Sequence, residues 1–168
     1  ELQEYSDVTY RMYDYGRLTA SGKPRELHIE RSLDVAHYAA STQIKAQPVT
    51  LPAAQGYEER CLVACRYFVT RELQLNARNA VNSRTGNSCV ILTSVGAEAQ
   101  VSYGERFVES VSLQRGETVV LPAALGEYRI EVNGALLRSY VPDADDEAWR
   151  LWTRENNDIQ SELPVQRG

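Results

Sequence analysis

The chain has 168 residues, of which 43% are hydrophobic, so it is long enough for one sizeable core or slightly more than one domain. Its 18 Lys and Arg residues are outnumbered by 23 Asp and Glu residues, which gives a net charge of −5. Nucleic acids and anionic membrane surfaces attract basic proteins, so we expect neither as a partner. The sequence also lacks an apolar run of the roughly 18 residues that a membrane helix needs.

The opening stretch, residues 1–17, combines acidic, basic and tyrosine side chains in a strand-like pattern. Successive side chains of a strand point to opposite faces, so alternate residues from Tyr5 to Tyr13 would share one polar and aromatic face. Such a face suits an anion-binding cleft, in which Glu1, Arg11 and Arg17 would be the charged members. The alternative is a solvated edge strand whose Arg and Tyr side chains pack along their own length.

A turn region at residues 18–24 contains a Gly and a Pro and should separate this stretch from a helix. The i, i+3, i+4 spacing about Ile29, Leu33 and Ala36 predicts a helix of about ten residues that ends near Tyr38. We therefore expect one short helix near the N-terminus.

The cysteines and histidines give only a weak metal signal. A strand would place Cys61 and Cys65 about 13 Å apart, beyond disulfide reach, and the odd count with Cys89 fits free thiols in a cytoplasmic protein. A C-x3-C pair without a second pair predicts buried thiols rather than a zinc site. His28 and His37 are nine residues apart and would face different ways on a helix, so we expect packing or capping for His28 and a surface position for His37.

From residue 43 onward, short runs of β-forming residues recur about every ten residues between turn signals. Eight such runs predict a mainly β sandwich or jelly-roll barrel. Apolar and polar residues alternate in 107–113 and in 128–132, which is typical of half-buried strands. Asn133–Gly134 is predicted to close a two-residue hairpin, because both central positions of that turn need a positive φ.

The C-terminal stretch begins with acidic residues and carries Trp149 and Trp152 within one turn. This pattern predicts an N-capped amphipathic helix. We expect its indoles to cover the barrel of the same chain rather than another domain or subunit, since large apolar residues at helical spacing usually belong to a core. Residues 156–168 should form a loose tail.

Residues 1–35, with their motifs SDVTYR and RELHIE, resemble the segment that closes the active site of class I mannose-6-phosphate isomerases. In that family a metal-ligand His is followed after nine residues by a Glu, then after ten by an Arg, and after six more by a second basic residue. Glu1, Arg11 and Arg17 match the last three positions. Arg17 replaces the Lys of many members; it keeps the positive charge but cannot act as a titrating base.

The resemblance implies a zinc-dependent enzyme that interconverts mannose 6-phosphate and fructose 6-phosphate through an enediol(ate). It implies a catalytic role for Arg11, which would stabilise anionic charge on the hexose 6-phosphate, and substrate binding by Glu1 and Arg17. The family's zinc ligands, a Gln, two His and a Glu, belong to sequence upstream of Glu1. We therefore expect that the chain is the C-terminal part of a longer isomerase, that zinc is bound by residues outside this chain, and that the fragment alone is inactive.

The resemblance also divides the chain into three parts. Residues 1–42 would close the catalytic cupin domain, residues 43–142 would form a degenerate cupin barrel packed on that N-terminal domain of the parent protein, and residues 143–168 would form a helical extension. Gly116–Pro122 resembles the start of the second cupin motif, but Glu127 stands where its metal His would fall, so we expect no metal centre in this barrel. The expected fold is thus a cupin-like jelly-roll barrel with one helix near each end.

Two alternatives remain open from the sequence. In a non-catalytic cupin-like carbohydrate-binding or scaffolding module, residues 1–17 would only form the first hairpin. A cupin-type sugar epimerase or dioxygenase is less favoured, because the sequence has no His-x-His pair for a cupin metal.

Overall fold

The computed structural model describes residues 9–36, 38, 45–52, 56–75, 79–96 and 98–156. The chain divides into two compact units, which are described separately: the N-terminal unit, Glu1–Ile44 with Asp158–Gly168, and the barrel unit, Lys45–Asn157. Within the described residues no helix is both long enough and apolar enough to cross a membrane.

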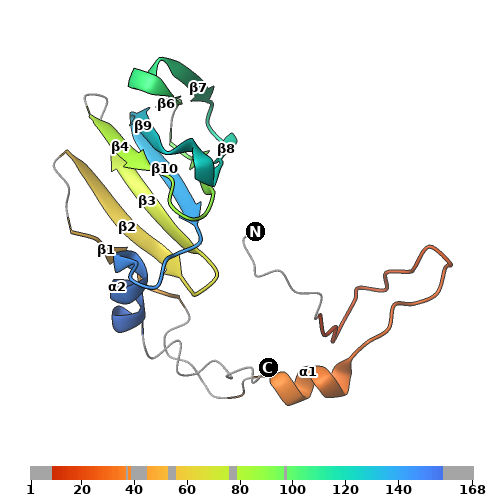
Figure 1. Cartoon of the computed structure of the whole chain (residues 1–168). Helices are drawn as coiled ribbons and strands as arrows, with labels where there is room; N and C mark the ends of the chain where they lie inside the picture. Colours follow the sequence, from red (N-terminus) through yellow and green to blue (C-terminus); the bar gives the residue numbers. More distant parts are fainter. Residues whose placement is uncertain are drawn as a thin grey trace. The chain divides into compact units, whose positions relative to one another are not determined.

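The N-terminal unit contains a loop followed by the helix α1 (Ile29–Val35), shown in Figure 1. The loop is closed by an isolated antiparallel bridge between Leu18 and Pro24. The helix has seven residues rather than the predicted ten, because Ala36 already adopts extended backbone with φ −70° and ψ 136°. Its only buried residue is Ser32. Three large apolar side chains of the helix are exposed: Ile29, Leu33 and Val35.

The barrel unit is a sandwich of two antiparallel sheets (Figure 1). Its strands are β1 (Val49–Thr50), β2 (Tyr57–Ala64), β3 (Val69–Leu75), β4 (Ala80–Arg84), β5 (Val90–Ser94), β6 (Ala99–Tyr103), β7 (Glu109–Leu113), β8 (Thr118–Leu121), β9 (Glu127–Val132) and β10 (Gly134–Tyr140). The six-stranded sheet has the order β1-β2-β3-β10-β5-β8, and the four-stranded sheet has the order β4-β9-β6-β7. Two short 3-10 helices, η1 (Glu105–Phe107) and η2 (Ala123–Leu125), connect strands. This architecture confirms the predicted mainly β jelly-roll class.

The predicted hairpin at Asn133–Gly134 is wrong. β9 pairs with β4 and β6, whereas β10 pairs with β3 and β5, so the chain passes from one sheet to the other at this point. Gly134 does have a positive φ of 143°, but this conformation serves the crossing rather than a two-residue turn. Gly96 lies against the crossing: a Cβ there would stand 2.5 Å from the backbone nitrogen of Ala135.

The main hydrophobic core lies between the two sheets. In β9 the residues Tyr128, Ile130 and Val132 are buried, while Glu127 and Glu131 are exposed, which confirms the half-buried pattern predicted for this strand. Burying one such apolar side chain contributes about 1.5–3 kcal/mol. The other members of this core are Leu73, Leu75, Val81, Val90, Leu92, Ala99, Val101, Leu113, Leu121 and Leu136.

The helix α2 (Glu147–Glu155) packs on β1 and β2 at one end of the six-stranded sheet (Figure 1). Its N-cap is Asp146, whose Oδ1 accepts a hydrogen bond from the backbone N of Trp149 at 2.9 Å, so the predicted acidic cap is confirmed. Trp152 is buried in a second cluster with Cys61 and Val69, and Trp149 packs against that cluster. The indoles thus cover the barrel of their own chain, as expected.

Candidate functional site

Arg11, the predicted catalytic residue, is held beside the start of α1. The backbone N of His28 donates to the carbonyl oxygen of Arg11 at 2.7 Å, and the backbone N of Arg11 donates to Nδ1 of His28 at 3.3 Å. The Arg11 Nη1 donates to the carbonyl oxygen of Glu26 at 3.0 Å, and the side chain is 23% exposed. The guanidinium is therefore partly buried and positioned, while its Nη2 has no partner among the described residues.

The His28 side chain is 21% exposed and lies beside the Tyr10 ring, with the two ring centroids 6.2 Å apart, which agrees with the packing alternative of the prediction. Because Nδ1 accepts a hydrogen bond, the neutral ring carries its proton on Nε2. The side chain makes no capping hydrogen bond to α1, although His28 is the N-cap residue. His37, for which we predicted a surface position, lies outside the described residues.

Asp14 joins two arginines of the N-terminal unit. Its Oδ1 accepts a hydrogen bond from Arg25 Nη2 at 2.9 Å and lies 3.6 Å from Arg11 Nε. Its Oδ2 lies 2.7 Å from Arg25 Nε in an ion pair, although that N–H is not directed at the oxygen. One carboxylate between two permanently charged guanidinium groups leaves a net charge of +1, which suits an anionic ligand. The sequence reasoning did not single out Asp14, although the i, i+3 spacing from Arg11 was a usable signal.

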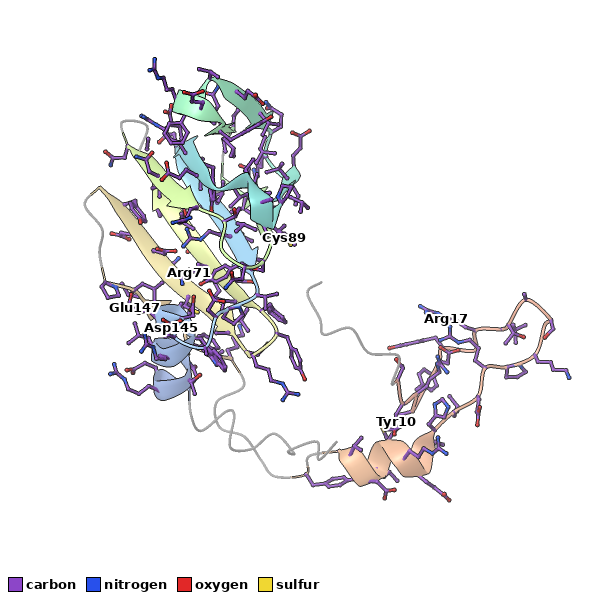
Figure 2. All side chains as sticks on the ribbon, viewed as in Figure 1. Tyr10, Arg17, Arg71, Cys89, Asp145 and Glu147 are labelled. Carbon is purple, nitrogen blue, oxygen red and sulfur yellow. The ribbon has the colours of Figure 1, made fainter. Side chains whose placement is uncertain are left out.

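Arg17 is exposed on the loop that precedes α1 (Figure 2). Its backbone N donates to the carbonyl oxygen of Asp14 at 2.9 Å, across a turn in which Tyr15 and Gly16 have positive φ. The structure thus places Arg17 in the same turn as Asp14. Glu1 lies outside the described residues, so the predicted grouping of Glu1 with the two arginines stays a prediction.

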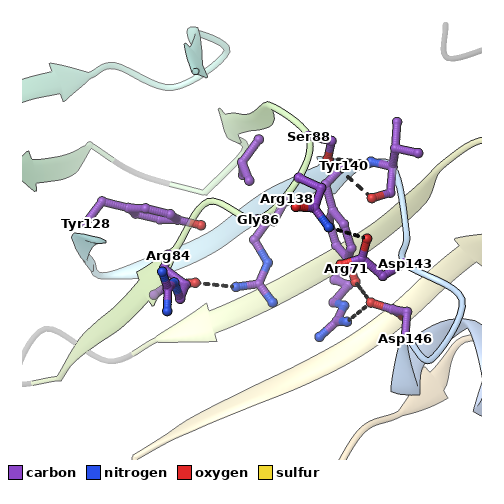
Figure 3. Close-up of a pocket in the computed structure, with 13 residues that line it drawn as sticks. Arg71, Arg84, Gly86, Ser88, Tyr128, Arg138, Tyr140, Asp143 and Asp146 are labelled. Atoms are coloured by element: carbon purple, nitrogen blue, oxygen red, sulfur yellow. Dashed lines mark hydrogen bonds and ion pairs between the residues drawn. The ribbon is translucent and has the colours of Figure 1, made fainter. Parts of the chain in front are cut away.

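A second cluster of charges, which the sequence reasoning missed, lies inside the barrel unit. Figure 3 shows its members Arg71, Arg138 and Asp146. Arg71 of β3 and Arg138 of β10 face each other in the strand register, and both contact Glu59 Oε1, at 3.4 and 2.7 Å. Asp146 Oδ2 accepts hydrogen bonds from Arg71 Nη2 at 3.0 Å and from the Tyr140 hydroxyl at 2.8 Å. The four charged side chains are 11–14% exposed, and their charges cancel.

Burial raises the pKa of Tyr140, Arg71 opposes this effect, and the hydrogen bond to Asp146 adds to it. The phenol therefore stays protonated and donates to Asp146 throughout the neutral range. Burial likewise raises the pKa of the Cys61 thiol to about 11, which disfavours the thiolate at neutral pH.

All three cysteines are free, as predicted. The expectation of burial, made for Cys61 and Cys65, is confirmed for Cys61, while Cys65 is only half-buried; Cys89 is exposed. Cys89 directly precedes β5, outside the apolar part of that strand, and this position explains its exposure.

A cavity of about 210 Å³ opens beside the charged cluster of the barrel (Figure 3). Residues of both sheets line it, among them Arg71, Ser83, Arg84, Tyr128 and Arg138. The Tyr128 side chain is fully buried, and its hydroxyl has no hydrogen-bond partner among the residues that the structure describes. Arg138 Nη1 donates to Ser83 Oγ at 3.1 Å and so links the two sheets across the cavity wall.

The described residues do not fit a zinc ion. No group of three or more His, Cys, Asp and Glu side chains is arranged among them to hold a metal. In the barrel, Glu127 and Glu131 occupy exposed positions of β9, and Glu131 pairs with Arg129 at 2.9 Å.

No protein-family model matches the chain. Bacterial mannose-6-phosphate isomerases, however, match most of its length. The mannose-6-phosphate isomerase of Streptococcus mutans serotype c is 26% identical over 140 residues, which are 83% of this chain. The mannose-6-phosphate isomerase ManA of Bacillus subtilis is 28% identical over 131 residues, which are 78% of this chain. The matches cover 42% and 39% of these relatives, so the chain spans about two fifths of their length.

Solved structures agree with the sequence matches. The crystal structure of the mannose 6-phosphate isomerase from Bacillus subtilis superposes with a TM-score of 0.61 at 25% identity, over 80% of this chain and 40% of that chain. An RmlC-like cupin from Shewanella frigidimarina superposes with a TM-score of 0.50 at 12% identity, over 66% of this chain and 98% of that chain, and shows the fold alone. The chain is thus a homologue of mannose-6-phosphate isomerases over about 80% of its length, with a barrel of the cupin fold.

Proposed function

We propose that the chain is one part of a zinc-dependent mannose-6-phosphate isomerase that interconverts mannose 6-phosphate and fructose 6-phosphate. The observation that carries this proposal is the extent of the match, since curated relatives with this name cover 78% and 83% of the chain. Those relatives are more than twice as long as the matched region. The rest of the active site, including a catalytic cupin domain, would therefore come from residues outside these 168.

Within this reaction, the chain would supply positive charge. Moving a proton between C1 and C2 of an aldose phosphate passes through an enediol(ate), so negative charge develops on the sugar oxygens beside the charge of the phosphate. We assign Arg11 to this negative charge, because a guanidinium presents a fixed fork of donors to an oxyanion. Its partly buried position and its Nη2 without a described partner support the assignment.

The remaining residues of the proposed site act around Arg11. Arg17 would add cationic field for the phosphate from its exposed loop, and Glu1 would orient a sugar hydroxyl. Asp14 is a positioning residue, since its carboxylate lies between the guanidinium groups of Arg11 and Arg25. We assign zinc to residues outside this chain, in keeping with the resemblance to the isomerase family, whose metal ligands lie upstream of the position of Glu1.

The test is an assay of fructose 6-phosphate formation by the protein purified at the full length that its gene encodes, with and without a chelator. Arg11→Ala should lower kcat by roughly 100-fold or more, the usual effect of removing one donor to a developing oxyanion. Arg11→Lys should lose less, because it keeps the charge but not the fork. Arg115→Ala, at an exposed turn of the barrel unit, is the matched control and should keep the wild-type rate.

Two outcomes would overturn parts of this proposal. A wild-type rate in Arg11→Ala, with an unchanged melting temperature, would remove the assignment of Arg11. If the wild-type protein forms no fructose 6-phosphate under any metal condition, the non-catalytic cupin-like carbohydrate-binding or scaffolding module becomes the better description.

A further inference from the structure

We propose that the cavity inside the barrel unit is a second small-molecule site, which binds a ligand through a phosphate or carboxylate group. This site is built from Tyr128, Arg84 and Arg138, so it is separate from the residues assigned to the isomerase reaction. The proposal does not depend on the isomerase activity, because binding can be measured directly.

The Tyr128 hydroxyl is the first observation. A fully buried phenol normally has a hydrogen-bond partner, because losing water without a replacement costs free energy. The Tyr128 side chain has no exposed surface, it lines the cavity, and its hydroxyl has no partner among the described residues. A ligand oxygen in the cavity would supply the missing acceptor.

Other buried donors of the cavity point to the same kind of ligand. The Nε atoms of Arg71 and Arg138 are also buried without a hydrogen-bond partner among the described residues. Together with the Tyr128 hydroxyl they make three donors, without partners, on residues that line one cavity. A group that only accepts hydrogen bonds suits such a wall best, and phosphate and carboxylate are the common groups of that type.

Arg84 is the cation of the cavity wall that is not held in an ion pair among the described residues. Arg71 and Arg138 are balanced by Glu59 and Asp146, with which they form ion pairs. Arg84 lines the cavity as well and has no ion-pair partner in the described part of the chain.

The remaining charge on the cavity wall is Asp143, whose Oδ1 accepts a hydrogen bond from Asn87 Nδ2 at 3.1 Å. Arg84 is thus the cation that a ligand oxyanion would meet. Asp143 offsets the charge of Arg84, so hydrogen-bond donors without partners, rather than a net positive charge, would hold the ligand.

The size and opening of the cavity also fit a small ligand. Its volume of about 210 Å³ is below the roughly 300–1,000 Å³ of pockets that take drug-sized molecules. Its rim includes the exposed residues Gly86, Asn87 and Asp143, so a ligand can enter from solvent.

The experiment is calorimetric titration of the full chain with inorganic phosphate and with malonate at constant ionic strength, and mannose is the neutral comparison. We expect saturable binding of phosphate, of malonate or of both. The anion with the higher affinity shows whether the site prefers a phosphate or a carboxylate group. Tyr128→Phe and Arg84→Gln should each weaken that binding by about tenfold or more, because each removes one donor from the anion.

Tyr103→Phe and Arg115→Gln are the matched controls, since they make the same changes outside the cavity lining, and both should bind as wild type does. The melting temperature of ligand-free Tyr128→Phe should equal or exceed that of wild type, because the change removes a buried hydroxyl without a partner. Lost binding in this variant would then not reflect lost folding. The proposal is overturned if neither anion binds, if both variants bind as tightly as the controls, or if mannose binds as tightly as the anions.

Discussion

Arg11 and Arg25 share one carboxylate on a unit whose helix leaves its apolar side chains exposed, whereas Arg71 and Arg138 share two carboxylates inside a closed sandwich. The first cluster keeps a net positive charge, and Nη2 of Arg11 has no partner among the described residues. The second cluster is electrically neutral and nearly enclosed. The difference teaches that similar groups of arginines and carboxylates can leave one positive charge uncompensated at the surface or cancel their charges inside a sandwich.

The hydrophobic side chains repeat this contrast. Among the described residues, every buried hydrophobic side chain belongs to the barrel unit. The helix α1 of the N-terminal unit exposes 43–52% of Ile29, Leu33 and Val35. The barrel unit therefore has its own core, while α1 leaves its apolar side chains exposed. The predictions below test this contrast in order of expected effect.

The largest effect is expected from breaking the buried cluster. Arg71→Met leaves Glu59 and Asp146 buried without this partner, so it should lower the free energy of unfolding by about 3–5 kcal/mol. Arg25→Met, the matching change in the N-terminal unit, should cost less than about 1 kcal/mol, because solvent screens that pair. Urea denaturation of the full chain measures both. Equal losses would abolish the distinction between the two clusters.

Removing a leucine side chain compares the two units directly. Leu73 is fully buried in the main core, so Leu73→Ala should lower the free energy of unfolding by about 2–5 kcal/mol. Leu33 is 43% exposed, and Leu33→Ala should change it by about 0.5 kcal/mol or less. Urea unfolding curves give both values. A large loss for Leu33→Ala would mean that α1 is already packed against another surface in solution.

The two helices differ in their caps, and this difference should be measurable. The Asp146 side chain caps α2, whereas the N-cap residue of α1 makes no side-chain cap. Asp146→Asn keeps the capping oxygen and loses the charge, while Asp146→Ala loses both. The alanine variant should therefore be less stable than the asparagine variant by about 1 kcal/mol in thermal or urea unfolding. If the two variants are equally stable, the cap contributes nothing and only the charge matters.

The last prediction concerns alkaline pH. The folded pKa of Cys61 is about 11, above its ordinary value of 9.0, so the stability that the protonated thiol contributes is complete below pH 9 and is lost as the pH rises toward 11. Tyr57 and Tyr140, whose pKa values are also raised by burial, add to this loss at higher pH. Urea midpoints between pH 8 and 11 should fall, and less steeply in Cys61→Ala. An identical slope in that variant would show that the tyrosines alone cause the fall.

Local patterns were sufficient to predict the fold class. The alternation in residues 128–132 and the acidic residues before Trp149 depend on neighbours in sequence, and both predictions are confirmed. The hairpin prediction at Asn133–Gly134 was wrong because a positive φ is a local signal, whereas the choice of sheet for β10 depends on distant partners in β3 and β5.

The candidate sites were harder to predict for the same reason. The charged cluster of the barrel joins Glu59, Arg71, Arg138 and Asp146, which come from separate elements and meet only through the register of three strands and the docking of α2. Charged residues at inward positions of apolar strands were the only signal in the sequence. Asp14, by contrast, lies three residues from Arg11, so its contact was within reach of a local argument.

Asp146 uses its two carboxylate oxygens for different tasks: Oδ1 holds the first turn of α2, and Oδ2 holds Arg71 and Tyr140. When the N-terminal turn of α2 unfolds and Asp146 moves away, Arg71 loses this ion-pair partner. Local opening of α2 is thereby coupled energetically to opening of β3, and amide hydrogens in both elements should exchange with solvent as one cooperative unit.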